Sequence, residues 1–441
     1  MTKVLHAWLE GRYVGEFVEA GSGRVTLRYD SDAPDTPVSL SIPRHGTVPE
    51  HAASRFLDNL LPDRPEAREW MRRITDARST STFDLLAEVG GDVAGGLVLL
   101  PTEDLPESAA TALLVADDDA IAFRISSLHQ DPDRWWERAD PARFSLAGSQ
   151  PKFALADVGG TWFWSNASVP STHIVKPAAS TNRGAERAEV AAERLAADIG
   201  LVAPRADVLD VAGERAYIVE RFDRAPQPNG IAARIHVEDL AQALGQAGAS
   251  KYAIGAKPII ELLLRHDPTG EAAHTFLRQA AFNAAIGNAD AHAKNYSVLL
   301  RPTGIELSPL YDALPTRLWP AYDDTLAMRI GGAEHPNELT LDHWSKLARR
   351  SGVDVDRARA EVRAVYEAVA DRADTAWTEL DDDQAERMRG LVAEQTRKIT
   401  SAVVGPAGIE PTTSTVKAGR LAVGNFGGAP SKPRFGERFA S

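Results

Sequence analysis

The sequence predicts an α+β fold, with short strands in much of the first half of the chain and helices in most of the second half. Two observations carry this prediction. Segments within 3–100 and 144–220 alternate apolar and polar residues and are interrupted by glycines, which is typical of strands and turns. From residue 236 onward, apolar residues recur at helical spacing. The length of 441 residues allows two or three domains.

The composition is that of an ordinary globular protein, and it excludes several kinds of site. Hydrophobic residues make up 44% of the chain and charged residues 25%. The formal net charge of −13 argues against unaided binding along a nucleic-acid backbone. The chain has no cysteine, so disulfides, cysteine-ligated zinc and cysteine nucleophiles are excluded. No apolar leader or membrane-spanning run is present, so we expect a cytoplasmic protein without membrane contact.

The sequence pattern of residues 1–105 predicts a small β-rich subdomain. LHAWLEGRYVGEF, RVTLRYD, PVSLSIP and GGLVLLP have strand patterns, while 51–61 and 82–90 have helical patterns. We find no catalytic constellation here and expect a scaffold or docking role. The following residues, to about 140, contain runs of aspartate and are expected to form a solvated connection with one short strand, AIAFRIS.

Chemistry first becomes visible between residues 144 and 177. Small residues in FSLAGSQPKFALA precede a strand pattern, and a glycine-containing turn lets backbone N–H groups approach phosphate oxygens. A later strand ends at Lys176, which could place its charge on those phosphates. Because Lys176 follows Ile174 and Val175, we expect it to be half-buried and to need a partner charge. An ordinary hairpin with a surface lysine is the alternative.

The partner is expected in the next helix, 184–199, which is rich in alanine and ends at a glycine. Glu186, Glu189 and Glu193 recur along it, and either one of them reaches Lys176 or all are solvated. Two strands follow. The sequence Phe222-Asp223-Arg224 then breaks the strand pattern, where a two-lobed enzyme would have its hinge.

From residue 236 we expect helices at 236–248, 258–267, 270–286, 339–352, 355–369 and 384–403. Between them lies GNADAHAKNYSVLL, in which Asp290 and Asn295 have the spacing D-x-x-x-x-N. Protein kinases use this spacing for a base and a Mg²⁺ ligand, and a second metal-binding aspartate follows on a hairpin, as Asp312 does here. Alone, the motif also fits a capped surface loop.

The order of these parts predicts a two-lobed protein-kinase-like fold, because phosphoryl transfer needs phosphate donors, a lysine, two metal ligands and a base. We expect the β-rich subdomain at 1–105, an N-lobe at 106–230, a mostly helical C-lobe at 231–403, and a disordered tail at 404–441.

Six segments in this order, SLAGSQPKFAL, THIVKP, VERFDR, HVEDLAQALG, GNADAHAKNYSVL and LSPLYDALPT, resemble the HipA family of bacterial serine/threonine toxin kinases. The first hundred residues are similar to that family's N-terminal subdomain, and the resemblance covers about 3–400. It implies that Asp290 is the catalytic base, that Asn295 and Asp312 hold Mg²⁺, and that Lys176 contacts ATP. It favours Glu189 as the lysine's partner, although Ala188 departs from the family's usual asparagine.

The resemblance also implies a phosphate loop at 145–152, a hinge from Glu220 to Phe222 that contacts adenine, and two supporting residues, Asp239 and Gln242. It makes Ser145 an autophosphorylation site whose modification ejects the loop and switches the enzyme off. Pro151 departs from a charged residue that is common there. His292 is either a substrate-contacting catalytic residue or a satisfied loop histidine. The nucleotide-binding residues that the resemblance implies are Ala147, Gly148, Ser149, Gln150, Lys152, Lys176, Glu220, Arg221, Phe222 and Asp223.

The resemblance further implies that the chain is the toxin of a toxin–antitoxin pair. Its substrate would be a protein hydroxyl, notably on an aminoacyl-tRNA synthetase. Its partner would be a HipB-like helix-turn-helix antitoxin through which alone it meets DNA. Two alternatives stay open: a small-molecule phosphotransferase, and a non-catalytic corepressor subunit of a DNA-binding antitoxin complex.

Overall fold

The computed structural model describes residues 2–105, 113–137, 144–178 and 182–401. The expected disordered tail at 404–441 lies outside these residues. The first 105 residues form an antiparallel sheet in the order β3-β2-β1-β4, covered by three helices. The tight turn between β1 and β2 contains Gly11 at φ 80°, a conformation that glycine adopts without strain. The elements are β1 (Lys3–Leu9), β2 (Arg12–Glu19), β3 (Val25–Tyr29), α1 (Ala52–Asp58), α2 (Pro65–Thr75), α3 (Thr82–Val89) and β4 (Leu97–Leu100).

Two expectations for the first 130 residues were wrong and one helix was missed. PVSLSIP forms no strand but a tight turn, closed by a bridge between Ser39 and Ile42, in which the Ser41 N–H donates to the Ser39 hydroxyl. AIAFRIS lies inside the helix α4 (Asp118–Gln130). The Asp117 side chain accepts the N–H of Ala120, and two more aspartates occupy the first turn, which favours a helix start. The missed helix is α2, which has a proline in its first turn.

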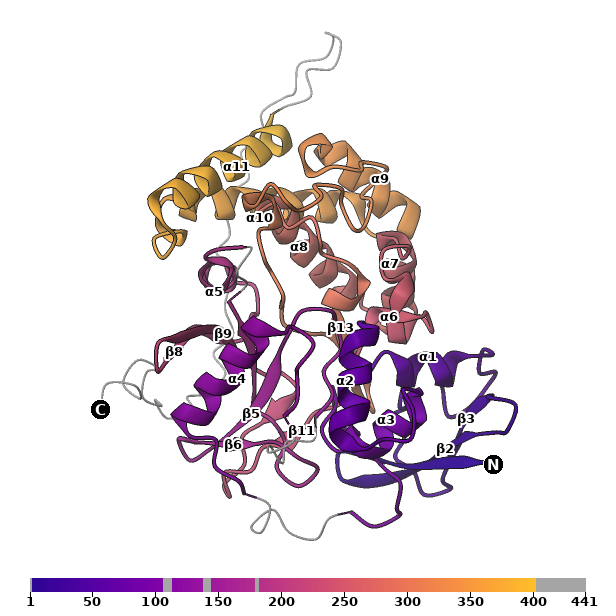
Figure 1. The fold of residues 1–441 in the computed structure, drawn as a ribbon. Coiled ribbons are helices and arrows are strands. Elements are labelled where there is room, and N and C mark those ends of the chain that lie inside the picture. Colours follow the sequence, from indigo (N-terminus) through magenta and orange to yellow (C-terminus); the bar gives the residue numbers. More distant parts are fainter. Residues whose placement is uncertain (1, 106–112, 138–143, 179–181, 402–441) are drawn as a thin grey trace.

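A five-stranded antiparallel sheet in the order β6-β5-β7-β9-β8 follows, with helix α5 on one side and α4 packed against β7, β8 and β9. In Figure 1, α5 lies between the strands β8 and β9 and the helices of the upper lobe. The strand β7 carries Lys176 and pairs with another strand on each side. The elements are β5 (Phe153–Val158), β6 (Thr161–Trp164), β7 (His173–Pro177), α5 (Ala185–Asp198), β8 (Ala206–Val211) and β9 (Glu214–Glu220).

The rest of the chain is mainly helical and forms the upper lobe in Figure 1. The expected helix at 236–248 is mostly wrong: residues 237–239 pair with β13 as a strand, and only four helical residues follow. Two short strands, β10 (Arg224–Ala225) and β11 (Ala233–Arg234), pair before this lobe. Its main elements are β12 (Val237–Asp239), α6 (Leu240–Ala243), α7 (Ala256–His266), α8 (Glu271–Ala285), β13 (Ser297–Arg301), β14 (Gly304–Leu307), α9 (Leu341–Ser351), α10 (Val355–Ala376) and α11 (Asp382–Thr400).

Two large hydrophobic clusters hold these parts together. One joins the N-terminal subdomain to the five-stranded sheet, from Leu5 through Phe144 to Ile218. The other joins α5 to the helical lobe, from Ala188 through Phe282 to Ile399. The N-terminal subdomain is therefore packed into the first lobe. The boundaries at 105 and 230 stay a prediction. Among the described residues, no helix is long and apolar enough to span a membrane.

Candidate active site

Lys176, near the end of β7, lies at the centre of a buried ionic cluster. Its Nζ donates to Oε1 of Glu189 and to Oδ1 of Asp312, each at 2.6 Å. Although burial alone would lower it, the carboxylates of Asp312 and Glu189 raise the pKa of Lys176 above its ordinary value. The expectation that a half-buried lysine needs a partner is met with two partners, from elements that are distant in the sequence.

The helix α5 presents all three of its glutamates to the protein interior, but only one reaches the lysine. Glu189 is 3% exposed and bonds Lys176. Glu193 accepts a hydrogen bond from the Tyr217 hydroxyl at 2.7 Å, and burial together with Glu189 raises the pKa of Glu193 well above its ordinary value. Glu186 is also buried, with Arg187 at 3.8 Å. The alternative of three solvated glutamates is therefore wrong, and the fold distinguishes between them.

Asp312 lies in the loop after β14 in a left-handed conformation, with φ 58°. Its Oδ1 accepts from Lys176, and its Oδ2 accepts from Nδ2 of Asn295 at 2.8 Å. Although burial alone would raise it, Lys176 and Lys152 hold the pKa of Asp312 well below its ordinary value. This carboxylate is therefore ionised, and it joins the sheet, the loop 287–296 and the loop after β14 at one point.

The loop 287–296, the predicted catalytic loop, connects α8 to β13 and is held by amide side chains and by its own backbone. Asn288 Oδ1 accepts the N–H of Asp290 at 3.1 Å, while its Nδ2 donates to Oδ1 of Asn283. The carbonyl of Asp290 accepts the N–H of His292, and the carbonyl of His292 accepts the N–H of Asn295. These bonds set the separation of Asp290 and Asn295 that the D-x-x-x-x-N spacing requires.

Asp290 is held from outside this loop by a tyrosine that sequence reasoning did not find. The hydroxyl of Tyr252 donates to Oδ1 of Asp290 at 2.9 Å. Burial raises the pKa of Asp290, and the hydrogen bond from Tyr252 acts in the opposite direction. The ring of His292 stacks edge-on against Tyr252 at 5.2 Å between centroids. Burial, aided by nearby Lys251, lowers the pKa of His292 to about 4, so this imidazole is neutral at pH 7.

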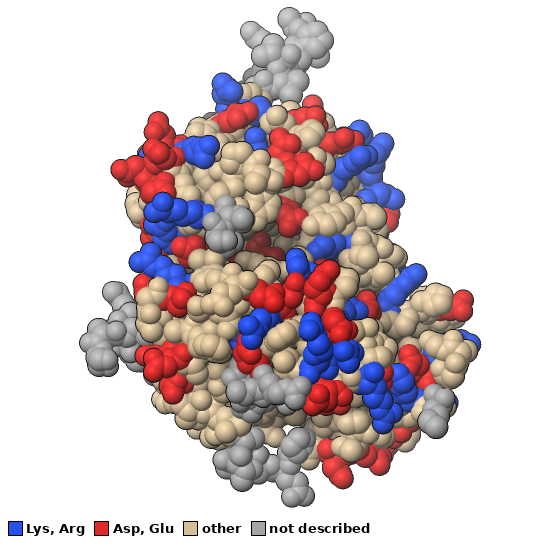
Figure 2. All heavy atoms as spheres, in the orientation of Figure 1, with Lys and Arg blue, Asp and Glu red and all other residues tan. Residues whose placement is uncertain are grey.

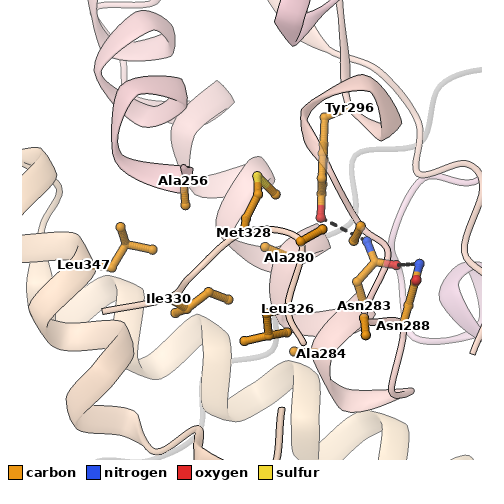
Figure 3. A pocket seen from close by; sticks show the side chains of 13 residues that line it. Ala256, Ala280, Asn283, Ala284, Asn288, Tyr296, Leu326, Met328, Ile330 and Leu347 are labelled. Carbon is orange, nitrogen blue, oxygen red and sulfur yellow. Dashed lines mark hydrogen bonds between the residues drawn. The ribbon is translucent and has the colours of Figure 1, made fainter. Parts of the chain in front are cut away.

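A small cavity of about 20 Å³ lies behind this loop. In Figure 3, Asn283, Asn288 and Tyr296 are joined by hydrogen bonds on one side, and Leu326, Ile330 and Leu347 lie on the other. This volume is enough for about one water molecule and too small for a substrate. The cavity therefore belongs to the support of the loop.

The segment 145–152 is folded against the N-terminal subdomain. Ser145 is fully buried, and its hydroxyl donates to the Leu60 carbonyl at 2.6 Å. Gly148, at φ 103°, accepts the N–H of Asp63 with its carbonyl at 3.0 Å. The remaining expected members are Ala147 and Gln150, which are half-buried, and Ser149, which is exposed.

Lys152 closes this segment from inside. Its Nζ donates to the carbonyl of Ala147 at 2.9 Å and lies over the ring of Trp135. Burial and the neighbouring Lys176 lower the pKa of Lys152 to about 8. Two lysines therefore face the same carboxylate, Asp312, and they form the most cationic part of the site.

At the expected hinge, two side chains contact the N-terminal subdomain. Arg221 and Asp223 pair with each other at 2.7 Å, and both bond the N-terminal subdomain, through the Val93 carbonyl and the Gly95 N–H. A buried ionic network with Asp92 and Arg224 holds both side chains.

The side chains of the other two residues expected near the hinge, Glu220 and Phe222, make different contacts. The Glu220 side chain pairs with exposed Arg205 at 3.2 Å. The ring of Phe222 lies 5.3 Å from the ring of Tyr311, which directly precedes Asp312. Among the expected hinge side chains, Phe222 is the one that lies beside the metal-ligand candidates.

Asp239 and Gln242 lie where β12 meets α6 and form a capping box there. Oδ2 of Asp239 accepts from Nζ of Lys294 at 2.7 Å, and Lys294 also donates to Oδ1 of Asn59 at 2.7 Å. Gln242 donates to the Phe56 carbonyl. Lys294 and Asn59, both missed from the sequence, thus connect the catalytic loop to the N-terminal subdomain. The position of Lys294 next to Asn295 was the available signal.

The side-chain oxygens of Asp312 and Asn295 suit a Mg²⁺ ion that is bound together with a nucleotide. Asp312 offers a carboxylate and Asn295 a carboxamide oxygen, the hard oxygen ligands that Mg²⁺ takes when phosphates complete its coordination. Among the described residues there is no cluster of three His, Cys, Asp or Glu that could hold a metal without such help. Figure 2 shows a recess between the two lobes, with acidic side chains inside it.

Comparison with known proteins finds two matching families. The model described as HipA N-terminal domain matches residues 5–100, and the one described as HipA-like C-terminal domain matches residues 144–377. Y4mE of Sinorhizobium fredii, a kinase by name, is 32% identical over 386 residues, which are 84% of this chain and 90% of that protein.

Two further similarities concern Shewanella oneidensis. Its serine/threonine-protein kinase toxin HipA is 29% identical over 362 residues, 77% of this chain and 81% of that protein. A solved complex of HipA, HipB and operator DNA from strain MR-1 contains a chain with a TM-score of 0.76 and 25% identity, covering 89% of this chain and 96% of that one.

Proposed function

Since the chain belongs to the HipA family, we propose that it is a serine/threonine protein kinase that uses ATP and acts as the toxin of a toxin–antitoxin pair. The observation that carries the proposal is the contact of Lys176 with both Glu189 and Asp312. Protein kinases need this lysine–glutamate pair and the metal-binding aspartate in place before transfer.

In the proposed reaction, the acceptor hydroxyl oxygen forms a bond to the γ-phosphorus of ATP. The bond from that phosphorus to the β–γ bridging oxygen breaks, and ADP leaves. Asp290 takes the proton of the hydroxyl as the bond forms. Burial raises the pKa of Asp290, which makes its carboxylate a better proton acceptor than an ordinary one.

Lys176 and Lys152 supply positive charge for the ATP phosphates. Lys176 is already fixed by Glu189, so its position is set before nucleotide binds, and this lowers the reorganisation that the reaction needs. Mg²⁺ held by Asp312 and Asn295 would neutralise charge that develops on the phosphates. For adenine, we propose the backbone of Phe222, because the side chains of Arg221 and Asp223 are bound elsewhere.

We further propose that the substrate is a component of translation, such as an aminoacyl-tRNA synthetase, and that a HipB-like helix-turn-helix protein is the partner. The similar Shewanella structure is a complex of HipA with HipB and DNA, which supports such a partner. The net charge of −13 supports contact with DNA through the partner rather than directly.

Autophosphorylation at Ser145 is also proposed. In this structure the hydroxyl is buried and bonded to Leu60, so the loop must leave its position before Ser145 can accept phosphate. A phosphate there could not return to the same buried place, since its charge would lack a partner. Ser145 phosphorylation would therefore hold the loop outside.

The test is phosphoproteomics after induced expression, with Asp290→Ala as the control. We expect new phosphoserine or phosphothreonine on a small set of proteins, and none with the variant. Labelled ATP added to purified protein and lysate gives a second readout. Label on no protein, the kinase included, would exclude the protein kinase and leave the small-molecule phosphotransferase. Growth arrest that persists with Asp290→Ala would favour the non-catalytic corepressor.

A further inference from the structure

A second hollow, of about 450 Å³, is lined mostly by the N-terminal subdomain. We call it the α2 hollow. Three separate parts of the chain form it: the subdomain, the segment 145–152, and the turn before α7. Its lining residues are Asp58, Asp63, Pro65, Arg68, Thr80, Ser149, Gly248, Ala249 and Lys251.

A continuous series of contacts leads from the α2 hollow to the catalytic base. Lys251 in its wall pairs with Asp63 at 3.0 Å and lies over the ring of Tyr252, 5.3 Å from its centroid. The hydroxyl of Tyr252 in turn donates to Asp290 at 2.9 Å. Tyr252 is 56% exposed, so its ring can turn away with little loss of packing. An oxygen at hydrogen-bond distance from the base is where an acceptor hydroxyl has to lie.

The charges of the lining argue for a neutral polar occupant. Arg68 pairs with Asp58 at 2.6 Å, and Lys251 pairs with Asp63, so the two cations are already compensated. A phosphate group would find no spare positive charge in this wall. Thr80 and Ser149 add neutral hydroxyls, while Gly248 and Ala249 leave room for a backbone. Such a lining fits an extended peptide with small polar side chains.

We propose that the α2 hollow binds the acceptor segment of the protein substrate, and that Tyr252 occupies the place of the acceptor hydroxyl until the substrate displaces it. This rests on the proposed kinase activity and extends it to substrate recognition. It also gives the N-terminal subdomain a role, since that subdomain supplies more than half of the lining.

The first test fills the hollow. Ala249 is exposed in the wall, so Ala249→Phe occupies the space without disturbing the core. The matched control is Ala360→Phe, at an exposed alanine of α10. With labelled ATP and host lysate, we expect Ala249→Phe to label protein acceptors at least about tenfold less than wild type. Its affinity for ATP should be unchanged. Labelling within about twofold of wild type would overturn the proposal, and so would a loss of ATP affinity, which would assign the hollow to nucleotide.

The second test needs no protein acceptor, so it separates the hollow from the kinase proposal. Tyr252→Phe removes the hydroxyl from Asp290 and admits water to its place. We expect the slow hydrolysis of ATP by the purified protein to rise several-fold. Tyr322→Phe, whose lost hydroxyl accepts from Asn182 among the described residues, is the control and should change little. A fall in hydrolysis with Tyr252→Phe would make Tyr252 a support of the base and overturn its role as a place-holder. If the wild-type protein labels no acceptor with labelled ATP, this result would count against the kinase proposal and not against the role of Tyr252 as a place-holder.

Discussion

The ammonium group of Lys176 lies 2.6 Å from Oδ1 of Asp312, and this contact joins the five-stranded sheet to the loop after β14. The two residues are 136 positions apart in the sequence. With Glu189 on the other side of the ammonium, the contact places phosphate-binding and metal-binding groups in one cluster.

The first prediction concerns this cluster. Lys176→Ala, Asp290→Ala and Asp312→Ala should each lower turnover by several orders of magnitude, because residues that act as a unit fail together. A double variant should be little worse than either single one. The measurement is initial-rate phosphorylation with purified protein, and Lys257→Ala, an exposed lysine on α7, is the control. Near wild-type turnover in any of the three would contradict the role given to that residue.

The second prediction is a shift in pH dependence. Asp290 must be deprotonated to act as a base, so turnover falls as the pH drops through its pKa. Burial raises that pKa and the Tyr252 hydroxyl opposes the rise in the free enzyme, so Tyr252→Phe should move the acidic limb of the kcat/KM profile to higher pH. Tyr322→Phe should leave it in place. A limb that stays unmoved in Tyr252→Phe would show that another group controls it.

The third prediction concerns the link between the catalytic loop and the N-terminal subdomain. Lys294→Met removes a buried cation from Asp239, whose side chain is 11% exposed, and breaking such a pair costs about 3–5 kcal/mol of the free energy of unfolding. Denaturant unfolding measures it. Lys398→Met, which breaks a surface pair with Glu394, should cost no more than about 1 kcal/mol. Equal losses in the two variants would argue against a structural role for Lys294.

The fourth prediction is a pH effect on stability. Burial raises the pKa of Glu238 to about 8, while its Oε1 accepts the N–H of Leu40. Between about pH 4.5 and pH 8, Glu238 holds a proton in the folded state that it has lost in the unfolded state. Stability from this group therefore falls as the pH rises from about 4.5 towards 8.

Glu238→Gln should remove this dependence. The difference in unfolding free energy between the variant and wild type should grow in favour of the variant by up to about 1.4 kcal/mol per pH unit. Chemical denaturation at several pH values measures it. A constant difference across the window would show that Glu238 does not hold its proton.

The fifth prediction addresses the buried serine. A phosphopeptide map of active protein should contain phosphoserine at Ser145. Ser145→Asp places a charge beside the Leu60 carbonyl and should release the segment 145–152, which limited proteolysis would detect as faster cleavage. Ser149→Asp, exposed in the same segment, should cleave at the wild-type rate. A map with only unmodified Ser145 would remove the proposed switch.

Local patterns in the sequence predicted most of the fold. Periodicity predicted the helices α5, α8 and α9 and the strands around Lys176 to within a few residues, because a helix or strand is recognised within one short window. It found the start of α10 but not its end, which lies at Ala376 instead of 369. It failed at α4, where short apolar runs fit strand and helix equally, and capping by Asp117 decided for the helix. It also failed at 237–239, where pairing with β13 overrode the helical pattern.

The sequence by itself determined the fold class, the family, and the candidates Lys176, Asp290, Asn295 and Asp312, since motif spacing carries this information locally. The resemblance favoured Glu189 among three glutamates, but only the tertiary structure brought it to Lys176, paired Arg221 with Asp223, and brought Tyr252 to Asp290. The physical reason is distance along the chain. These contacts join segments from different elements, and their partners are set by how sheet, helices and subdomain pack against one another.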